Sequence, residues 1–314
     1  MTHLRIVFAG SPSAAVPSLR AIAASDHDIA AVLTRLDSPK GRTRVPTPTA
    51  VGAAAAELRL PTITSNRPGD EVTGQISSLA ADLGVIVAYG AILREPLLSA
   101  PRLGWINLHF SLLPRWRGAA PVQRAIVAGD QLTGASVFQL VPALDAGDVY
   151  GQFTQPIGGN ETAGNLLDSL AAGGAELLVR VIDAIADGSA RGEPQVGDVT
   201  LAPKLTLEDG RIDWTAHAST VHDLIRGVTP EPGAFTTLDG ARLKVLDAAT
   251  APGGQRLAPG RLAPGRLALD GRRLLAGTAS DPIELVTVQP AGKNAMAAAD
   301  WWRGRPADAG MIVE

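Results

Sequence analysis

Short apolar segments alternate with helical stretches over roughly the first 190 residues. Residues 83–88 carry no polar side chain, and a strand that is apolar on both faces belongs inside a parallel sheet covered by helices. Further strands are predicted at Leu4–Ala9, Ile29–Thr34, Trp105–His109 and Ala135–Leu140, and helices at Ala14–Ala24, Ala50–Leu60 and Ala119–Ala128. This interleaving predicts an α/β domain with a doubly wound, mostly parallel sheet.

The pattern changes in the C-terminal third of the chain. Residues 191–206 lose hydrophobic periodicity and contain glycines and prolines, which predicts a linker. After them, short alternating segments are separated by turns such as Asp239-Gly240 and Asp270-Gly271, a pattern typical of a small, OB-like β-barrel. We therefore expect an α/β domain over 1–190, a linker over 191–206 and a β-barrel domain over 207–314.

The composition argues against several kinds of chemistry. The chain has no cysteine, which excludes disulfides, thiolate catalysis and cysteine-bound zinc. Its five histidines show no metal-ligand spacing, so we expect no metal cofactor. It has neither a long apolar run nor a signal-peptide pattern, so we expect a cytoplasmic protein without a membrane span. With a formal net charge of −3, any contact with nucleic acid has to be local.

The turn after the first strand disfavours a nucleotide cofactor. It reads Gly10-Ser11-Pro12, with one glycine where the dinucleotide fingerprint needs three. A phosphate-binding loop of the Walker type is also missing from the sequence. Another chemistry therefore has to be sought at the carboxyl end of the sheet.

Asn107 and His109 stand two residues apart at the end of a predicted strand, so their side chains point to the same side. Ligands bind at this edge of open α/β sheets. An amide can donate to a developing oxyanion and an imidazole can move a proton, which together suit acyl transfer. The loop after the next strand, Leu144–Asp148, supplies Asp145 and Asp148 as candidate partners of the imidazole. Each residue also has an ordinary interpretation, as a structural histidine or a turn residue.

Several longer motifs carry a resemblance. Asn107–His109, Ser111–Pro121 and Leu144–Asp148, with Phe8–Pro12, Val87–Gly90, Ala202–Leu205, Arg211–Trp214 and Gln289–Lys293, strongly resemble the methionyl-tRNA formyltransferases. The Asn/His/Asp set is shared with the wider superfamily of 10-formyltetrahydrofolate-dependent transferases. The resemblance implies transfer of the formyl group of 10-formyltetrahydrofolate to the amino group of methionyl initiator tRNA. It assigns the formyl oxygen to Asn107, proton transfer to His109, and pairing with His109, which should raise the imidazole pKa, to Asp145.

The resemblance also implies binding residues and domain roles. Residues 1–190 would form the catalytic domain, and the barrel over 207–314 would support the tRNA. The protein would act as a monomer. Folate contacts are implied for Ser111, Leu112, Leu113, Pro114, Tyr89 and Gly90. An exposed loop carrying Arg35, Lys40, Arg42 and Arg44 would approach the tRNA, with Lys204, Arg211 and Lys293 as candidates on the barrel.

Other functions stay open at this point. The same triad would serve a folate-dependent formyltransferase acting on a small amine of the sugar-nucleotide or glycinamide type, or a hydrolase that releases formate. A non-catalytic RNA-binding relative is a further alternative. The basic loop and the barrel favour a tRNA, because a small substrate needs neither. An Arg-Leu-Ala-Pro-Gly duplication at 256–265 has no function assigned to it and fits a duplicated loop segment.

Overall fold

The computed structural model describes residues 3–40, 45–250, 262–305 and 312–314. The chain forms two compact units, the first made of residues 1–121, 132–156 and 167–202 and the second of 122–131, 157–166 and 203–314. These boundaries differ from a simple division into two consecutive domains. Residues 191–202, within the stretch expected to be a linker, belong to the first unit, because they bond to it at several points described below. Most of the duplicated segment lies outside the described residues.

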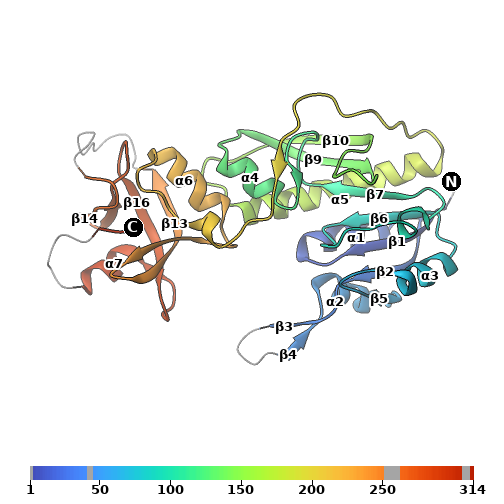
Figure 1. Ribbon diagram of the computed structural model, residues 1–314, viewed down its shortest axis with the longest axis horizontal. Helices are drawn as coiled ribbons and strands as arrows, with labels where there is room; N and C mark the ends of the chain where they lie inside the picture. The colour runs from blue at the N-terminus through green and yellow to red at the C-terminus, as the bar shows by residue number, and fades with distance from the viewer. Residues whose placement is uncertain (1–2, 41–44, 251–261, 306–311) are drawn as a thin grey trace. The chain divides into compact units, whose positions relative to one another are not determined.

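The first unit is built on a seven-stranded sheet (Figure 1). Its order is β10-β9-β7-β6-β1-β2-β5, with β7 antiparallel to β9, β9 antiparallel to β10 and the other pairs parallel. The strands are β1 (Arg5–Gly10), β2 (Asp28–Thr34), β5 (Thr62–Thr64), β6 (Leu83–Val87), β7 (Trp105–His109), β9 (Leu132–Gln139) and β10 (Val149–Pro156). The chain winds outward from β1 in both directions, which confirms the predicted fold class.

Helices cover the sheet as the apolar strands require. The described helices of the first unit are α1 (Val16–Ala23), α2 (Ala50–Glu57), α3 (Asp70–Ser78) and most of α5 (Ala163–Ala186), with short 3₁₀ turns η1 (Ser13–Ala15) and η2 (Leu97–Ser99), whereas nearly all of α4 (Pro121–Val127) belongs to the second unit. At Gly174 of α5 a Cβ would lie 2.9 Å from Leu108, so this helix packs closely on that face of β7. Asn107 and His109 alternate with Leu108 and therefore point to the opposite face.

Gly84 on β6 makes room for a neighbouring tryptophan. The fully buried Trp105 lies opposite it on β7, and a Cβ at Gly84 would come 2.1 Å from the indole ring. The ring is also held by a 2.9 Å hydrogen bond from its Nε1 to the Leu97 carbonyl. We expect Gly84→Ala to lower the free energy of unfolding by about 1–3 kcal/mol through overpacking, measured by urea denaturation. The control Gly74→Ala, in open space on α3, should instead gain about 0.5–1 kcal/mol; equal effects of the two would contradict this account.

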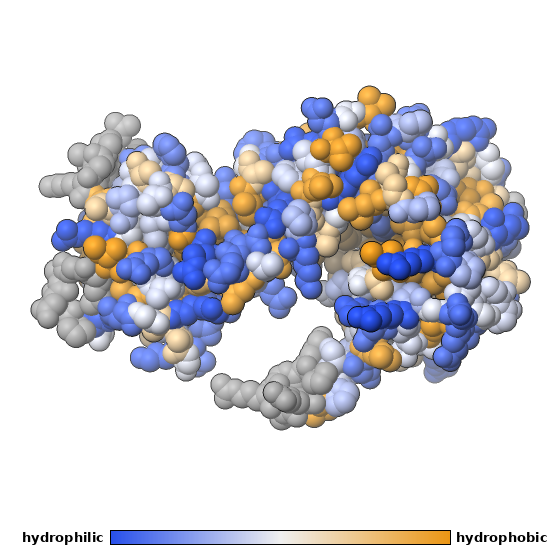
Figure 2. All heavy atoms as spheres, in the orientation of Figure 1, coloured by the Kyte–Doolittle hydropathy of each residue, from blue (hydrophilic) through white to orange (hydrophobic). Residues whose placement is uncertain are grey.

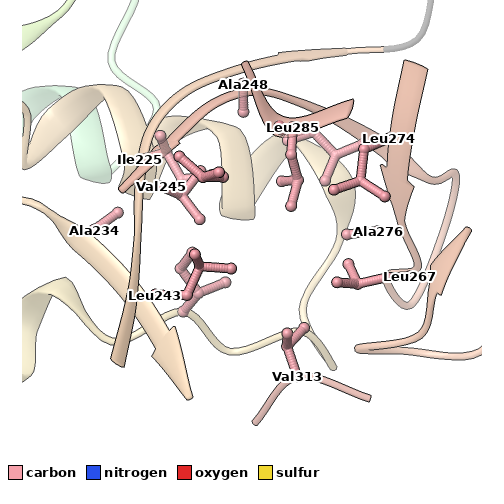
Figure 3. Close-up of a cluster of buried hydrophobic side chains, with 14 of the residues drawn as sticks. Ile225, Ala234, Leu243, Val245, Ala248, Leu267, Leu274, Ala276, Leu285 and Val313 are labelled. Carbon is pink, nitrogen blue, oxygen red and sulfur yellow. The ribbon is translucent and has the colours of Figure 1, made fainter. Parts of the chain in front are cut away.

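The second unit contains an antiparallel sheet of order β12-β13-β16-β15-β14, to which β17 is added beside β16. Its strands are β12 (Ala234–Leu238), β13 (Ala241–Thr250), β14 (Leu267–Asp270), β15 (Arg273–Ala276), β16 (Ile283–Pro290) and β17 (Met296–Ala297), and its helices include α6 (Ala218–Gly227) and α7 (Ala298–Arg303). Figure 3 shows Leu243, Val245, Leu274 and Leu285 of three of these strands gathered in one core. This sheet domain is consistent with the predicted small barrel.

The predicted turns of this sheet join its hairpins. Asp239 and Gly240, between β12 and β13, have φ of 50° and 73°, and Gly271, between β14 and β15, has φ of 62°. At 239–240 both residues of the two-residue loop are left-handed, which suits Asp-Gly, whereas Asp270 pairs with Arg273 and the second loop is Gly271-Arg272 with glycine first.

The described part of the chain contains no helix that is both long and apolar enough to cross a membrane. On the face visible in Figure 2, hydrophobic residues are interspersed with hydrophilic ones.

Candidate active site

The site begins at the carboxyl end of β7. His109 is 6% exposed and Asn107 is half-buried on the same side of the strand. Opposite them on β9 lie Ser136 and Phe138, and the Phe138 ring meets the imidazole edge-on at 6.3 Å between centroids. Within the described residues, the Asn107 side-chain amide makes no hydrogen bond, so both its donors remain available.

The two nitrogens of His109 have different partners. Nε2 lies 2.8 Å from the backbone carbonyl of Trp116, which only accepts, so this nitrogen carries the hydrogen. Nδ1 lies 3.9 Å from Oδ2 of Asp145, beyond direct hydrogen-bond distance. Nδ1 is therefore the nitrogen placed to gain and lose a proton. The carboxylate beside it would stabilise the charge that the proton brings.

Burial lowers the pKa of His109, while the charge of Asp145 and the hydrogen bond to Trp116 raise it. The upward effect expected of Asp145 is present, but desolvation of the buried ring outweighs it. The net effect keeps the imidazole neutral at physiological pH, in the form that a proton acceptor needs.

Asp145 is reached by an unexpected route. Because β9 runs antiparallel to β7, Gln139 at its end pairs with Ile106 near the start of β7, away from His109. The following loop returns until Oδ2 of Asp145 accepts a 2.8 Å hydrogen bond from the backbone N–H of Gly118. Asp145 has a φ of 44°, a left-handed conformation that is uncommon outside glycine.

A glutamine and an arginine hold this loop. The Gln195 side-chain amide donates to the carbonyls of Asp145 and Gly147 at 2.8 and 2.9 Å. Its oxygen accepts from Nε and Nη2 of Arg117 at 3.1 and 2.6 Å. Sequence reasoning missed both residues. Arg117 falls within the quoted Ser111–Pro121 motif, but the aperiodic stretch around Gln195 carries no local signal of a contact 50 residues away.

The predicted folate loop, Ser111–Pro114, is tied to the sheet through Ser136 of β9. The Ser111 hydroxyl donates to the Arg115 carbonyl at 2.6 Å, and the Ser111 carbonyl accepts from Ser136 at 2.6 Å. Leu113 is buried and its N–H donates to the same Ser136 hydroxyl at 3.1 Å. Pro114 is buried as well, whereas Leu112 is half-buried. The structure thus gives Ser111, Leu113 and Pro114 roles in shaping the loop.

Tyr89 and Gly90 follow β6 at the same edge of the sheet. The Tyr89 side chain is 1% exposed within the core and its hydroxyl donates to the Ser65 carbonyl at 2.6 Å. Burial raises the pKa of this hydroxyl. The Tyr89 side chain is therefore not accessible to a ligand. Gly90, with φ of 86°, has no side chain to cover the exposed backbone of the turn.

The predicted tRNA loop is described in part. Arg35 is exposed, its Nε donates to Asn66 at 3.2 Å, and its side chain lies 3.6 Å from where a Gly90 Cβ would be. Arg35 thus lies beside the Tyr89–Gly90 turn. Lys40 ends β3 (Ser38–Lys40), which pairs with β4 (Val45–Thr47). Arg42 and Arg44 lie outside the described residues.

The second unit carries a separate basic surface. Arg211 and Arg242 both lie over the Phe235 ring, with Cζ 5.0 and 4.5 Å from its centroid. Beside them an open hollow of about 450 Å³ is lined by Arg242, Lys244, Gln289, Pro290, Ala291 and Gly292. Lys293, exposed, follows this lining, and Lys204 is exposed in the same unit. Arg211 and Arg242 thus lie over one aromatic ring, and Lys244 pairs with the same Phe235 across the two strands. Among the described residues no group of three His, Asp or Glu side chains is close enough to hold a metal ion.

Comparison with known proteins places this geometry in a family. Residues 4–182 match the formyl transferase family and residues 204–306 its C-terminal domain. A methionyl-tRNA formyltransferase of Clavibacter sepedonicus is 58% identical over 301 residues, covering 96% of this chain and 97% of that protein. One of Arthrobacter sp. (strain FB24) is 50% identical over 311 residues, covering 99% and 100%.

Solved structures share the fold at low sequence identity. An N-formyltransferase from Helicobacter canadensis in complex with folinic acid and dTDP-3-aminofucose has a TM-score of 0.68 at 15% identity, covering 91% of this chain and 99% of that one. HypX from Aquifex aeolicus has a TM-score of 0.65 at 16% identity, covering 98% of this chain and 49% of that one. At such identities the likeness concerns the fold alone.

Proposed function

Because this chain belongs to the methionyl-tRNA formyltransferase family, we propose that Asn107, His109 and Asp145 transfer the formyl group of 10-formyltetrahydrofolate to the amino group of methionyl initiator tRNA. One observation carries the assignment of residues. The buried imidazole is fixed by Trp116 through Nε2, and its Nδ1 faces the Asp145 carboxylate beside the available amide of Asn107.

Each of the three side chains has one task in the reaction. The folate supplies the formyl carbon, which the methionyl amine attacks. The Asn107 amide donates a hydrogen bond to the formyl oxygen as negative charge builds on it. Nδ1 of His109 accepts the proton that the amine loses and holds it for the leaving nitrogen. Asp145 stabilises the imidazolium during that interval.

The folate is assigned to this edge of the sheet from two features of its residues. The Tyr89–Gly90 turn offers backbone groups, and Leu112 is the side chain of the 111–114 loop that remains partly accessible. We therefore assign the folate to the Tyr89, Gly90 and Ser111–Pro114 segments. In this assignment the Ser111, Leu113 and Pro114 side chains hold the loop in shape, and the Tyr89 ring supports the turn from the core.

Arg35, Lys40, Arg42 and Arg44 are proposed to neutralise phosphates near the acceptor end of the tRNA, and the basic hollow of the second unit to contact its backbone further away. We expect the triple change of Lys40, Arg42 and Arg44 to alanine to weaken tRNA binding and to reduce the slope of log K against log salt by about 2–3. Folate affinity should stay constant. The readout is tRNA binding titrated at several salt concentrations.

The matched control for this experiment is Arg180→Ala, which removes an exposed arginine from α5. We expect it to leave the salt slope unchanged. A triple variant with the wild-type slope would show that the loop does not meet phosphates.

We further propose that the protein acts as a cytoplasmic monomer without a metal ion. The chemistry assigned to the three residues needs proton transfer and oxyanion stabilisation only. Light scattering tests the monomeric state, and activity after treatment with a chelator tests whether a metal ion is needed.

The assay for the function is formyl transfer to methionine-charged initiator tRNA, with release of tetrahydrofolate as the second product. We expect turnover with the tRNA and none with an amino-sugar nucleotide or a glycinamide nucleotide. Turnover on a small amine alone would instead support the small-substrate branch of the superfamily.

A further inference from the structure

Gln195 has every polar group of its side-chain amide engaged. Arginine only donates, so the oxygen must face Arg117 and the nitrogen must face the carbonyls of Asp145 and Gly147. This arrangement fixes the orientation of the amide without ambiguity. The two N–H donors of Gln195 therefore bond to the two ends of the segment 145–147. This segment holds the Asp145 carboxylate near His109.

Three consecutive residues, Trp116, Arg117 and Gly118, bond to His109, Gln195 and Asp145 respectively. Trp116 accepts from His109, Arg117 donates to Gln195, and the Gly118 N–H donates to Asp145. This segment is anchored in turn by Thr200, whose carbonyl accepts from Arg117 N at 2.9 Å and whose hydroxyl accepts from Trp116 N at 2.8 Å. At Gly118 the approach is so close that a Cβ would lie 2.6 Å from the Ala202 carbonyl oxygen.

We propose that Arg117 and Gln195 form a positioning pair that holds the Asp145 carboxylate beside His109 and so sets the proton affinity of the imidazole during formyl transfer. The proposal rests on the function given above. Neither residue is required to touch substrate. They fix a loop whose functional residue has a left-handed backbone and lies near His109 without a direct hydrogen bond to it.

The decisive variant is Gln195→Met, which keeps the length of the side chain and removes both donors. We expect kcat to fall about tenfold while KM for folate and for tRNA changes by less than about twofold. In the described part of the chain the charged side chain that acts on His109 is Asp145, while Trp116 and Phe138 contact the ring without charge. Release of Asp145 should therefore lower the pKa of His109 and move the acidic limb of kcat to lower pH.

Two further variants separate the halves of the contact. Gln195→Glu keeps an acceptor for Arg117 but loses both donors, and we expect the defect of Gln195→Met. Arg117→Lys keeps the charge with a single donor group, and we expect a smaller loss of kcat. These variants also carry the test if Gln195→Met fails to fold. Wild-type behaviour of Gln195→Glu would overturn the proposal.

The matched control is Gln155→Met on β10, whose oxygen accepts from Ser169 far from the loop. It should leave kcat and the pH profile unchanged. The experiments distinguish a failure of the proposed function from a failure of the positioning role. Normal formyl transfer together with an unchanged His109 titration in Gln195→Met would refute the role alone. If the wild type transfers no formyl group, NMR titration of His109 without substrate still decides: an unaltered pKa in Gln195→Met refutes the pair, and a lowered one supports it.

Discussion

Replacing Asn107 by alanine is expected to lower kcat by about 10²–10³-fold, the usual effect of removing one donor to an oxyanion. The reason lies in the position of the side chain, half-buried at the end of β7 on the same side as His109, with its amide unengaged among the described residues. The loss should appear in kcat and leave folate binding within a small factor, because the charge on the formyl oxygen develops only during the reaction. Single-turnover formyl transfer to methionyl-tRNA measures it.

The matched variant is Asn107→Asp, which preserves shape and replaces the donor by an acceptor. We expect a loss at least as large as with alanine, since a carboxylate would repel the developing charge. Near-normal turnover in either variant would remove Asn107 from the catalytic group, whatever the state of the rest of the site.

The second large effect is expected for Asp145→Asn. The new side chain can still accept from the Gly118 N–H, so the loop should keep its place. We expect kcat to fall by about 10²–10³-fold, somewhat less than the ~10⁴ seen where the partner of a catalytic histidine is directly hydrogen-bonded, because here the two groups lie 3.9 Å apart.

The pH dependence gives this prediction its sign. The negative charge of Asp145 raises the pKa of His109 against the larger lowering effect of burial. Without that charge the pKa falls further, so the neutral base persists to lower pH and the acidic limb of kcat shifts downward, while the weaker base gives a lower plateau. NMR titration of the imidazole and a kcat profile between about pH 5 and 9 measure the two effects. A limb that moves upward would show that Asp145 acts by another means.

Features that depend on local sequence patterns could be predicted correctly. Alternation in β7 placed Asn107 and His109 on one side, and apolar content predicted a sheet covered on both faces. The Asp-Gly pairs at 239–240 and 270–271 predicted the two hairpins, although in the second Asp270 ends the strand and the loop is Gly271-Arg272. Such features depend on neighbours in the chain and on the period of a strand, which the sequence displays directly.

Contacts between distant segments could not be predicted in the same way. The direction of β9 is invisible in its composition, so the return of its loop to His109 follows only from the sheet order. Tyr89 illustrates a second limit, because an aromatic residue beside a predicted ligand turn proved to be a core residue hydrogen-bonded to Ser65. Gln195 illustrates a third, since its partners lie in two other segments and its own surroundings look like a linker.

The strand formed by Arg117–Gly118 has a consequence for how this protein can change over time. Trp116, Arg117 and Gly118 each serve a different partner in immediate succession, Trp116 and Gly118 through backbone groups and Arg117 through its side chain. An insertion or deletion there would shift all three out of register together. Variation in chain length should therefore be confined to other loops.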